Sequence, residues 1–178
     1  MRDSPPPQSR KQGGPSSWPS GGPGVQPVRI ARGRANPSTK NDWASTMTLV
    51  DANIPVYAAG VNGDRERQEV ALGALEAIHG HGALAVQVLA EYSHVMLRHR
   101  VPIAVVLRDV AALQAAWTIH SPTRETVSLA LEGIAEHHMS FWDATLWAVA
   151  KENGLDDILS EDGPTGTTVG SVLFPSPL

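Results

Sequence analysis

The sequence predicts an α/β fold in which a mostly parallel central sheet carries helices on both faces, and two observations lead to this prediction. Short apolar runs of β type alternate along residues 47–178 with longer segments of helical periodicity, and such alternation is typical of parallel sheets. The segment from Ser140 to Gly154 is helical and apolar on nearly every side, as expected of a helix buried against a sheet.

The expected strands are short and lie at 47–51, 83–86, 117–119, 157–160 and 171–174. The expected helices lie at 56–59, 64–79, 87–99, 102–114, 122–137 and 140–153. Pro122 and Ser140 mark two helix starts, and Gly154 ends the last helix. Residues 163–170 are rich in glycine and are expected to form a loop.

The composition restricts the class of protein. The chain has 178 residues, enough for one domain with a sizeable core, and no cysteine, which excludes disulfides and thiolate metal sites. It has no apolar run near the roughly 18–20 residues that a membrane span needs. Its basic N-terminus lacks the apolar segment of a secretory signal. We therefore expect a cytoplasmic protein that does not enter a membrane.

The first 46 residues differ in composition from the rest. Proline, glycine and serine fill 21 of these 46 positions, so we expect a disordered extension that buries too little surface to fold. Met47 stands directly before the first strand, and a start of translation at Met47 is the alternative. Residues 1–46 carry a net charge of +5 and residues 47–178 one of −9, so the acids of the domain need an explanation.

Four acidic residues are candidates for a site. Asp51 and Asp162 follow strands, at the ends where α/β sheets bind their ligands, while Glu91 lies in a helix and Asp143 in the first turn of another. Carboxylates that share a pocket repel one another unless a cation intervenes. Mg²⁺ takes oxygen ligands and retains several waters, so an open pocket of carboxylates suits it and would support phosphodiester hydrolysis.

Asp143 has a second interpretation. Ser140 and Asp143 have the spacing of a capping box, and an acid in the first turn interacts favourably with the helix dipole. The residue taken alone therefore fits a helix cap as well as a site, and the other three acids have to decide between the two.

Four short segments form an ordered set along the chain. They are Val50-Asp51-Ala-Asn53, Val88-Leu-Ala-Glu91-Tyr, Ser140-Phe-Trp-Asp143-Ala and Leu159-Ser-Glu-Asp162-Gly. In order and spacing they resemble the motifs of PIN-domain ribonucleases of the VapC toxin type. The resemblance spans about residues 47–175 and implies a PIN-like three-layer α/β sandwich, with residues 1–46 outside the family pattern.

The resemblance implies a metal-dependent endoribonuclease that is the toxin of a toxin–antitoxin pair. The four acids would bind Mg²⁺ or Mn²⁺, and Asn53 and Ser160 would orient these ligands or a water. Glu161 is a neighbouring acid, and we favour Asp162 as the ligand. The implied partners are RNA, a cognate antitoxin that blocks the pocket, and a second copy of the chain. For this homodimer, the helices at 64–79 and 102–114 offer apolar surface.

Two other functions compete with this one. Acids at strand ends also occur in phosphoaspartate receivers and phosphatases, but those usually need a lysine near the phosphoryl group. Lys151 is the one lysine after residue 46, and it lies late in a helix. The second alternative is a non-catalytic PIN-fold module that only engages an antitoxin, against which the complete set of acids argues.

The remaining polar and aromatic side chains have simpler interpretations. The seven histidines lack the spacing of an HExxH metal motif. The three tryptophans of the domain lie in apolar segments, so core or dimer-interface positions are favoured over base stacking; they are Trp117, Trp142 and Trp147. Three arginines are the better RNA candidates, and two of them also suit a helix C-terminus; they are Arg98, Arg100 and Arg108.

Overall fold

A computed structural model of the protein describes residues 47–175, and the prediction for residues 1–46 lies outside this range. The strands of the described part are β1 (Thr48–Val50), β2 (Gly82–Ala85), β3 (Thr118–His120), β4 (Asp157–Leu159), β5 (Thr167–Val169) and β6 (Val172–Phe174). Its helices are α1 (Asn53–Ala58), α2 (Arg65–Ala77), α3 (Val86–Arg98), α4 (Ile103–Ala116), α5 (Arg124–His137) and α6 (Phe141–Glu152). No helix of residues 47–175 is long and apolar enough to span a membrane.

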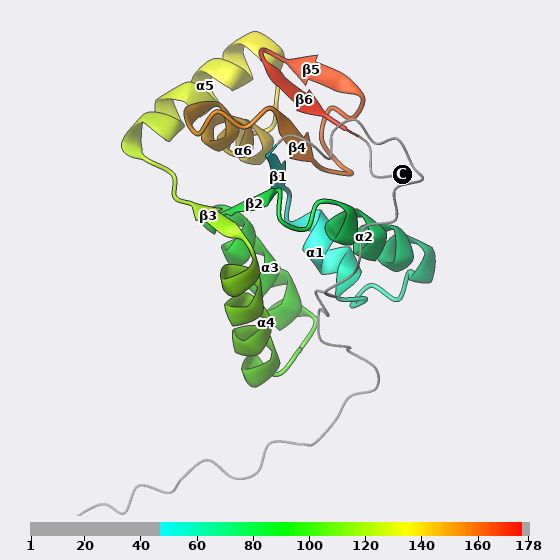
Figure 1. Ribbon diagram of the computed structural model, residues 1–178. Helices are drawn as coiled ribbons and strands as arrows, with labels where there is room; N and C mark the ends of the chain where they lie inside the picture. Colours follow the sequence, from blue (N-terminus) through cyan, green and yellow to red (C-terminus); the bar gives the residue numbers. More distant parts are fainter. Residues whose placement is uncertain (1–46, 176–178) are drawn as a thin grey trace, which may run out of the picture.

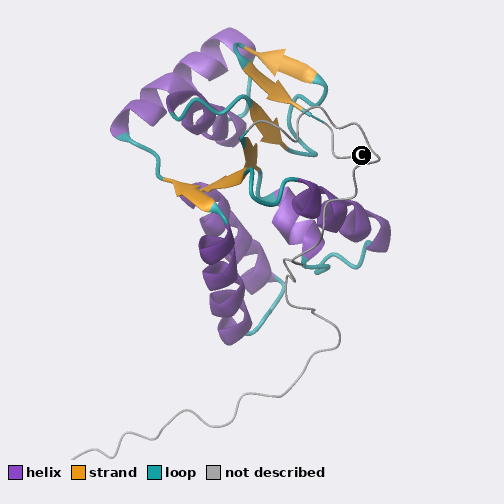
Figure 2. Ribbon diagram, viewed as in Figure 1, coloured by secondary structure: helices purple, strands orange, loops and turns teal. Residues whose placement is uncertain are grey.

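All six strands form one sheet, in the order β3-β2-β1-β4-β6-β5. The pairs β1–β2, β1–β4, β2–β3 and β4–β6 are parallel, and β5–β6 alone is antiparallel. Figure 1 shows α5 and α6 on one side of this sheet and the other helices on its opposite side. Helices therefore cover both faces (Figure 2), and the predicted mostly parallel α/β sandwich is confirmed.

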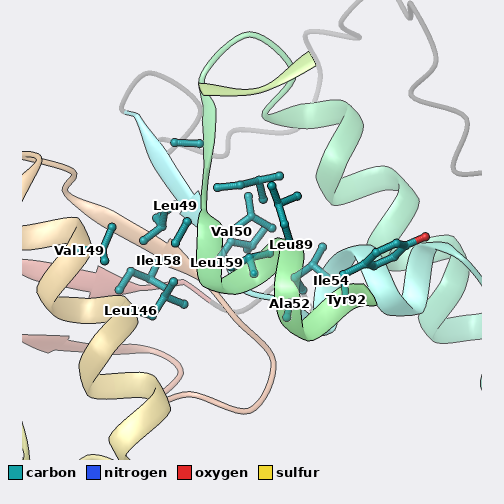
Figure 3. Packing of buried hydrophobic residues seen from close by; sticks show 14 of the residues in the cluster. Leu49, Val50, Ala52, Ile54, Leu89, Tyr92, Leu146, Val149, Ile158 and Leu159 are labelled. Atoms are coloured by element: carbon teal, nitrogen blue, oxygen red, sulfur yellow. The ribbon is translucent and has the colours of Figure 1, made fainter. Parts of the chain in front are cut away.

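The core lies on both faces of the sheet because side chains alternate along its two central strands. The parallel register places Leu49 beside Ile158 and Val50 beside Leu159. Figure 3 shows the first pair toward Leu146 of α6, whereas the second pair lies toward α3. All four strand side chains are fully buried. The two helical layers thus fix the central strands from both sides, and the strand ends become a rigid support.

The segment expected to be a loop at 163–170 contains a strand. Residues Thr167–Val169 form β5 and pair antiparallel with β6 across a turn at Gly170, whose φ is +60°. Threonine and valine favour strands, and a glycine is suited to this left-handed turn position. The Trp147 indole also donates to the Val169 carbonyl at 2.9 Å, so α6 holds the hairpin in place.

Two helices start more than one residue away from their predicted positions. Helix α1 begins at Asn53 instead of 56, because Pro55 lies in its first turn, where the missing N–H has no helical partner anyway. Helix α5 begins after Thr123 instead of at Pro122. There the Thr123 N–H donates to the Thr126 hydroxyl at 2.8 Å and completes a reciprocal cap. Neither difference moves a predicted site residue.

Candidate functional site

The parallel pairing of β1 and β4 brings two polar segments together at the carboxyl ends of these central strands. Val50 pairs with Leu159 in the last register position of both strands, so the chain leaves both at the same level. Asp51 and Ser160 are the next residues, and the Asp51 N–H donates to the Leu159 carbonyl at 3.0 Å. The predicted placement of Asp51 beyond a strand end is what the structure shows.

Asp51 is held by three hydrogen bonds from uncharged donors. Its Oδ2 accepts from the Ser160 hydroxyl at 2.7 Å and from Asn53 Nδ2 at 3.2 Å. Its Oδ1 accepts from the Ala52 backbone N–H at 2.6 Å. The orientation that the sequence predicted for Asn53 and Ser160, toward the acids, is therefore present for Asp51.

Asn53 also connects Asp51 to the acid after β4. Its Nδ2 lies 3.4 Å from Asp162 Oδ2, which is exposed. The neighbouring acid, Glu161, turns instead to Arg67 of α2, with a distance of 3.2 Å between Oε1 and Nη2. The Arg67 guanidinium in turn lies 5.3 Å from the centre of the Tyr57 ring. This pairing occupies Glu161 and supports the choice of Asp162 as the site residue.

Glu91 reaches the site from α3. Helix α3 begins directly after β2, the neighbour of β1, so its first turns lie close to Asp51. Gln87, one turn earlier, donates from Nε2 to Glu91 Oε1 at 2.7 Å and approaches the Trp142 carbonyl of α6 at 3.4 Å. Gln87 was not identified from the sequence. Its i, i+4 spacing from Glu91 was the available signal.

Asp143 occupies the first turn of α6 and is engaged by Ser140. The Ser140 hydroxyl donates to Asp143 Oδ2 at 2.7 Å and accepts from the Asp143 N–H at 3.2 Å. The N-cap half of the predicted capping box is therefore formed, and the Asp143 carboxylate binds the Ser140 hydroxyl. The charge of Asp143 also raises the pKa of Asp51, so Asp143 takes part in the Ser140 cap and also acts on Asp51.

The pKa of Asp51 reflects its burial and the charges of neighbouring acids. Burial raises its pKa from 3.8 to about 6, the hydrogen bonds from Ser160 and Ala52 oppose this rise, and the charges of Glu91 and Asp143 add to it. Within residues 47–175 the ion pairs leave out all four site acids and join Arg67 to Asp64 and Glu161, Arg108 to Asp109, Arg124 to Glu125, and His137 to Glu136. The described chain thus supplies no cation to the acids it gathers.

The donor set fits a hard divalent cation. All four predicted ligands offer carboxylate oxygens, and two amide oxygens beside them, Asn53 Oδ1 and Gln87 Oε1, are buried without a hydrogen-bond partner. In the arrangement described for residues 47–175, no three acids or histidines lie close enough together to hold an ion. Hydrogen bonds or mutual charge link the acids around Asp51, but their oxygens do not converge on one point.

An apolar groove of about 750 Å³ opens beside Glu91, between α3 and the first turns of α5 and α6. Phe141 and Trp142 form one wall, and their side chains are 44% and 60% exposed. Trp117 and Trp147, by contrast, are buried, as the sequence led us to expect. Trp142 does not lie in the core of this chain, so of the two positions expected for the tryptophans a dimer interface is the one left for it.

Comparisons with known proteins agree with this fold. The family model described as PIN domain matches residues 48–163. Among solved structures, Mycobacterium tuberculosis VapC20, described as a toxin that cleaves the sarcin-ricin loop, is similar with a TM-score of 0.55 and 22% identity, covering 66% of this chain and 91% of that one. A toxin–antitoxin complex from Klebsiella pneumoniae gives 0.57 and 18%, covering 74% and 98%.

The structure of FitAB bound to the IR36 DNA fragment is also similar, with a TM-score of 0.54 and 16% identity, covering 74% of this chain and 95% of that one. No curated protein sequence gives a significant match. At these identities the solved structures establish the shared fold. The family match spans well over half of the sequence and includes all four acids, and the chain belongs to the PIN domain family.

Proposed function

We propose that the protein is a metal-dependent endoribonuclease and the toxin of a toxin–antitoxin pair. One observation carries the proposal: the charges of Glu91 and Asp143 act on Asp51, Asn53 connects Asp51 to Asp162, and the ion pairs of residues 47–175 include none of these four acids. Such a group is stable when a cation from outside the chain neutralises it. Membership of the PIN family and the toxins among its structural neighbours support the same function.

The four acids would hold Mg²⁺ or Mn²⁺, as hard ions prefer oxygen ligands. A divalent ion supplies positive charge and Lewis acidity to a phosphodiester and its attacking water. The residues of the chain provide the fixed geometry. Ser160, Asn53 and the Ala52 N–H orient both oxygens of Asp51. Gln87 holds Glu91 in the same way.

RNA binding needs a positive charge that the domain itself hardly offers. Of the arginines expected to contact phosphate, Arg108 is paired with Asp109 at 3.0 Å. Arg98 and Arg100 are exposed at the far end of α3, seven or more residues beyond Glu91. At 1.5 Å per residue this is roughly 10 Å or more from Glu91. The bound ion would therefore be the main attraction for the scissile phosphate, with these arginines serving more distant parts of the RNA.

The test is RNA cleavage by the purified full chain with and without Mg²⁺ or Mn²⁺. We expect cleavage with either ion, no cleavage in EDTA, and recovery when the ion is restored. A protein that binds the product of a neighbouring antitoxin gene but leaves RNA intact with both ions would instead be the non-catalytic binding module.

We also propose a homodimer, for which one of the two predicted surfaces is suitable. On α4 the side chains of Ile103 and Leu107 are largely exposed, whereas Ala71 and Leu75 of α2 are buried within the domain. The surface predicted at 64–79 is therefore used inside the fold, since α2 packs on α1. Light scattering of the full chain at micromolar concentration should give twice the chain mass. A mass of one chain would contradict the dimer.

A further inference from the structure

The first turn of α6 presents two aromatic rings to solvent. Phe141 and Trp142 lie edge to face, with ring centres 5.3 Å apart and an interplanar angle of 74°. Exposing two adjacent large rings is costly, because each could bury a large apolar area. The two other tryptophans of residues 47–175 are buried and pack in the core. A surface of this kind on a small domain indicates a binding partner.

The aromatic rings are fixed relative to the acids of the site. Trp142 directly precedes Asp143, and its carbonyl lies 3.4 Å from the Gln87 amide nitrogen that also holds Glu91 at 2.7 Å. Glu91 and Gln87 line the same groove as the two rings. The groove is therefore continuous with the proposed catalytic acids, and whatever occupies it lies beside the reacting phosphate.

The chemistry of the groove favours an uncharged, flat ligand. Its walls are mainly apolar, and its titratable members are Glu91 and His94; the apolar ones include Val86, Ala90, Val95, Pro122 and Val127. An acid and a set of aliphatic side chains would repel a phosphate but accept a heterocyclic ring. The volume of about 750 Å³ falls in the usual range for small-ligand pockets and exceeds that of one base.

We propose that Trp142 and Phe141 form a stacking surface for a nucleobase of unpaired RNA, next to the phosphodiester that is cleaved. This inference rests on the proposed ribonuclease function and adds the form of its substrate. A base inside a duplex is already stacked and paired, so only an unpaired base can present its face to the indole. Trp142 is thus a specificity-determining residue that selects single-stranded or looped RNA over duplex.

The first test measures binding of the full chain to oligouridine, oligoadenosine and the duplex of the two, by fluorescence anisotropy in Ca²⁺ with intact RNA verified on gels. We expect Trp142→Ala to weaken binding of both single strands by about tenfold or more. Trp142→Phe should retain most of the affinity because it keeps an aromatic face. Leu131→Ala, at a similarly exposed side chain of α5 that lies outside both the groove and the proposed dimer surface, is the matched control and should bind like wild type.

A second test uses any oligonucleotide that the wild type cleaves. Removing one base at a time, as an abasic sugar, should identify one position beside the cut that raises KM more than it lowers kcat. At this position Trp142→Ala should add no further loss, because ring and base are partners in one contact. An abasic series in which the effect of Trp142→Ala is the same at every position would overturn the proposal.

The outcomes distinguish the base-stacking proposal from the ribonuclease function on which it rests. A wild type that cleaves no RNA removes the ribonuclease function itself. If the wild type cleaves but Trp142→Ala binds and cleaves single strands normally, the function stands and the stacking surface is wrong. A Trp142→Ala chain that handles RNA normally but loses dimer mass in light scattering would show that the groove is an interface between copies, which also overturns the proposal.

Discussion

Two adjacent residues of α3, Glu91 and Tyr92, contact different groups of acids, and only one of these groups receives a counter-charge from the chain. Asp109 of α4 is 2% exposed, accepts a hydrogen bond from the Tyr92 hydroxyl at 3.1 Å, and lies 3.0 Å from the Arg108 guanidinium. Glu91, the residue before Tyr92, belongs to the site, where the hydrogen bonds described come from uncharged amide, hydroxyl and backbone groups. The acid that Tyr92 contacts is thus paired with an arginine, whereas Glu91 has no ion pair within residues 47–175.

The difference teaches how to recognise a functional acid. An acid that stabilises the fold receives its counter-charge from the chain, because a buried carboxylate without one is costly. Acids that lie near one another without a counter-charge from the chain repel one another, and a cation from outside the chain relieves this repulsion. Each prediction below would either sharpen or break this distinction.

The largest effect is expected for Asp143→Asn. Asparagine keeps the cap and loses a dipole contribution of roughly 0.3–1 kcal/mol, but relief of repulsion with Asp51 compensates. We expect cleavage in Mg²⁺ or Mn²⁺ to fall by more than the roughly 10- to 100-fold typical of an outer partner, and metal affinity to fall in calorimetry. Melting in EDTA should hold or rise.

Asp156→Asn is the matched control, since Asp156 is exposed at the opposite end of β4. It should change neither cleavage nor melting. If Asp143→Asn cleaved RNA at the wild-type rate, Asp143 would be a helix cap and nothing more, and the unmatched charge would have no function there.

The second prediction concerns pH. The unfolded chain releases the Asp51 proton near pH 3.8 and the folded chain near 6, so between these values the folded state binds more protons. The free energy of unfolding in EDTA should therefore fall as the pH rises from about 4 to 6, by up to about 3 kcal/mol from this group. Urea unfolding of wild type and Asp51→Asn across this range measures the difference. If the free energy of unfolding had the same pH dependence in both proteins, folding would not raise the pKa of Asp51.

Tyr92→Phe tests the buried acid Asp109, which Tyr92 and Arg108 contact. It leaves Asp109 buried with Arg108 as its remaining partner, so we expect a loss of about 1–3 kcal/mol in the free energy of unfolding. RNA cleavage should be unchanged. In an Asp109→Asn background the same substitution should cost less, because a neutral amide tolerates the missing hydroxyl better. A stability loss that is independent of Asp109 would assign the effect to packing instead.

The smallest effect is expected for Glu161→Gln. Its ion pair with the half-exposed Arg67 contributes at most about 1 kcal/mol, and cleavage should stay near the wild-type rate. Asp162→Asn, one residue away, should lower cleavage strongly while leaving stability in EDTA intact. The reverse ranking would move the ligand role from Asp162 to Glu161.

Most of the fold was readable from the sequence because its elements have clear periods. The buried strand 48–50, the apolar helix α6 and the strand 157–159 lie within a residue or two of their predicted bounds. The main exception is β5, because Thr167–Val169 is mostly polar and exposed and lies between two glycines, as a loop would. It exists through its pairing with β6 and its contact with Trp147, and both are tertiary.

The sequence also predicted part of the site. The positions of Asp51 and Asp162 follow from strand ends, and the choice between Glu161 and Asp162 agrees with the pairing of Glu161 to Arg67. The bridge from Gln87 to Trp142 spans 55 residues of sequence. The exposure of Trp142 depends on how α6 approaches α3. Neither can be read from local pattern, because both arise where two helices meet.

The sheet also bears on how molecules of this protein can pair through their strands. Its two edges are β3 and β5, and each has only three residues. An edge strand offers its free N–H and C=O groups to any passing chain, and a short one offers few. Joining several such molecules edge to edge would therefore gain little hydrogen bonding. The short edge strands thus limit association between molecules through their strands, while helices cover the two faces of the sheet.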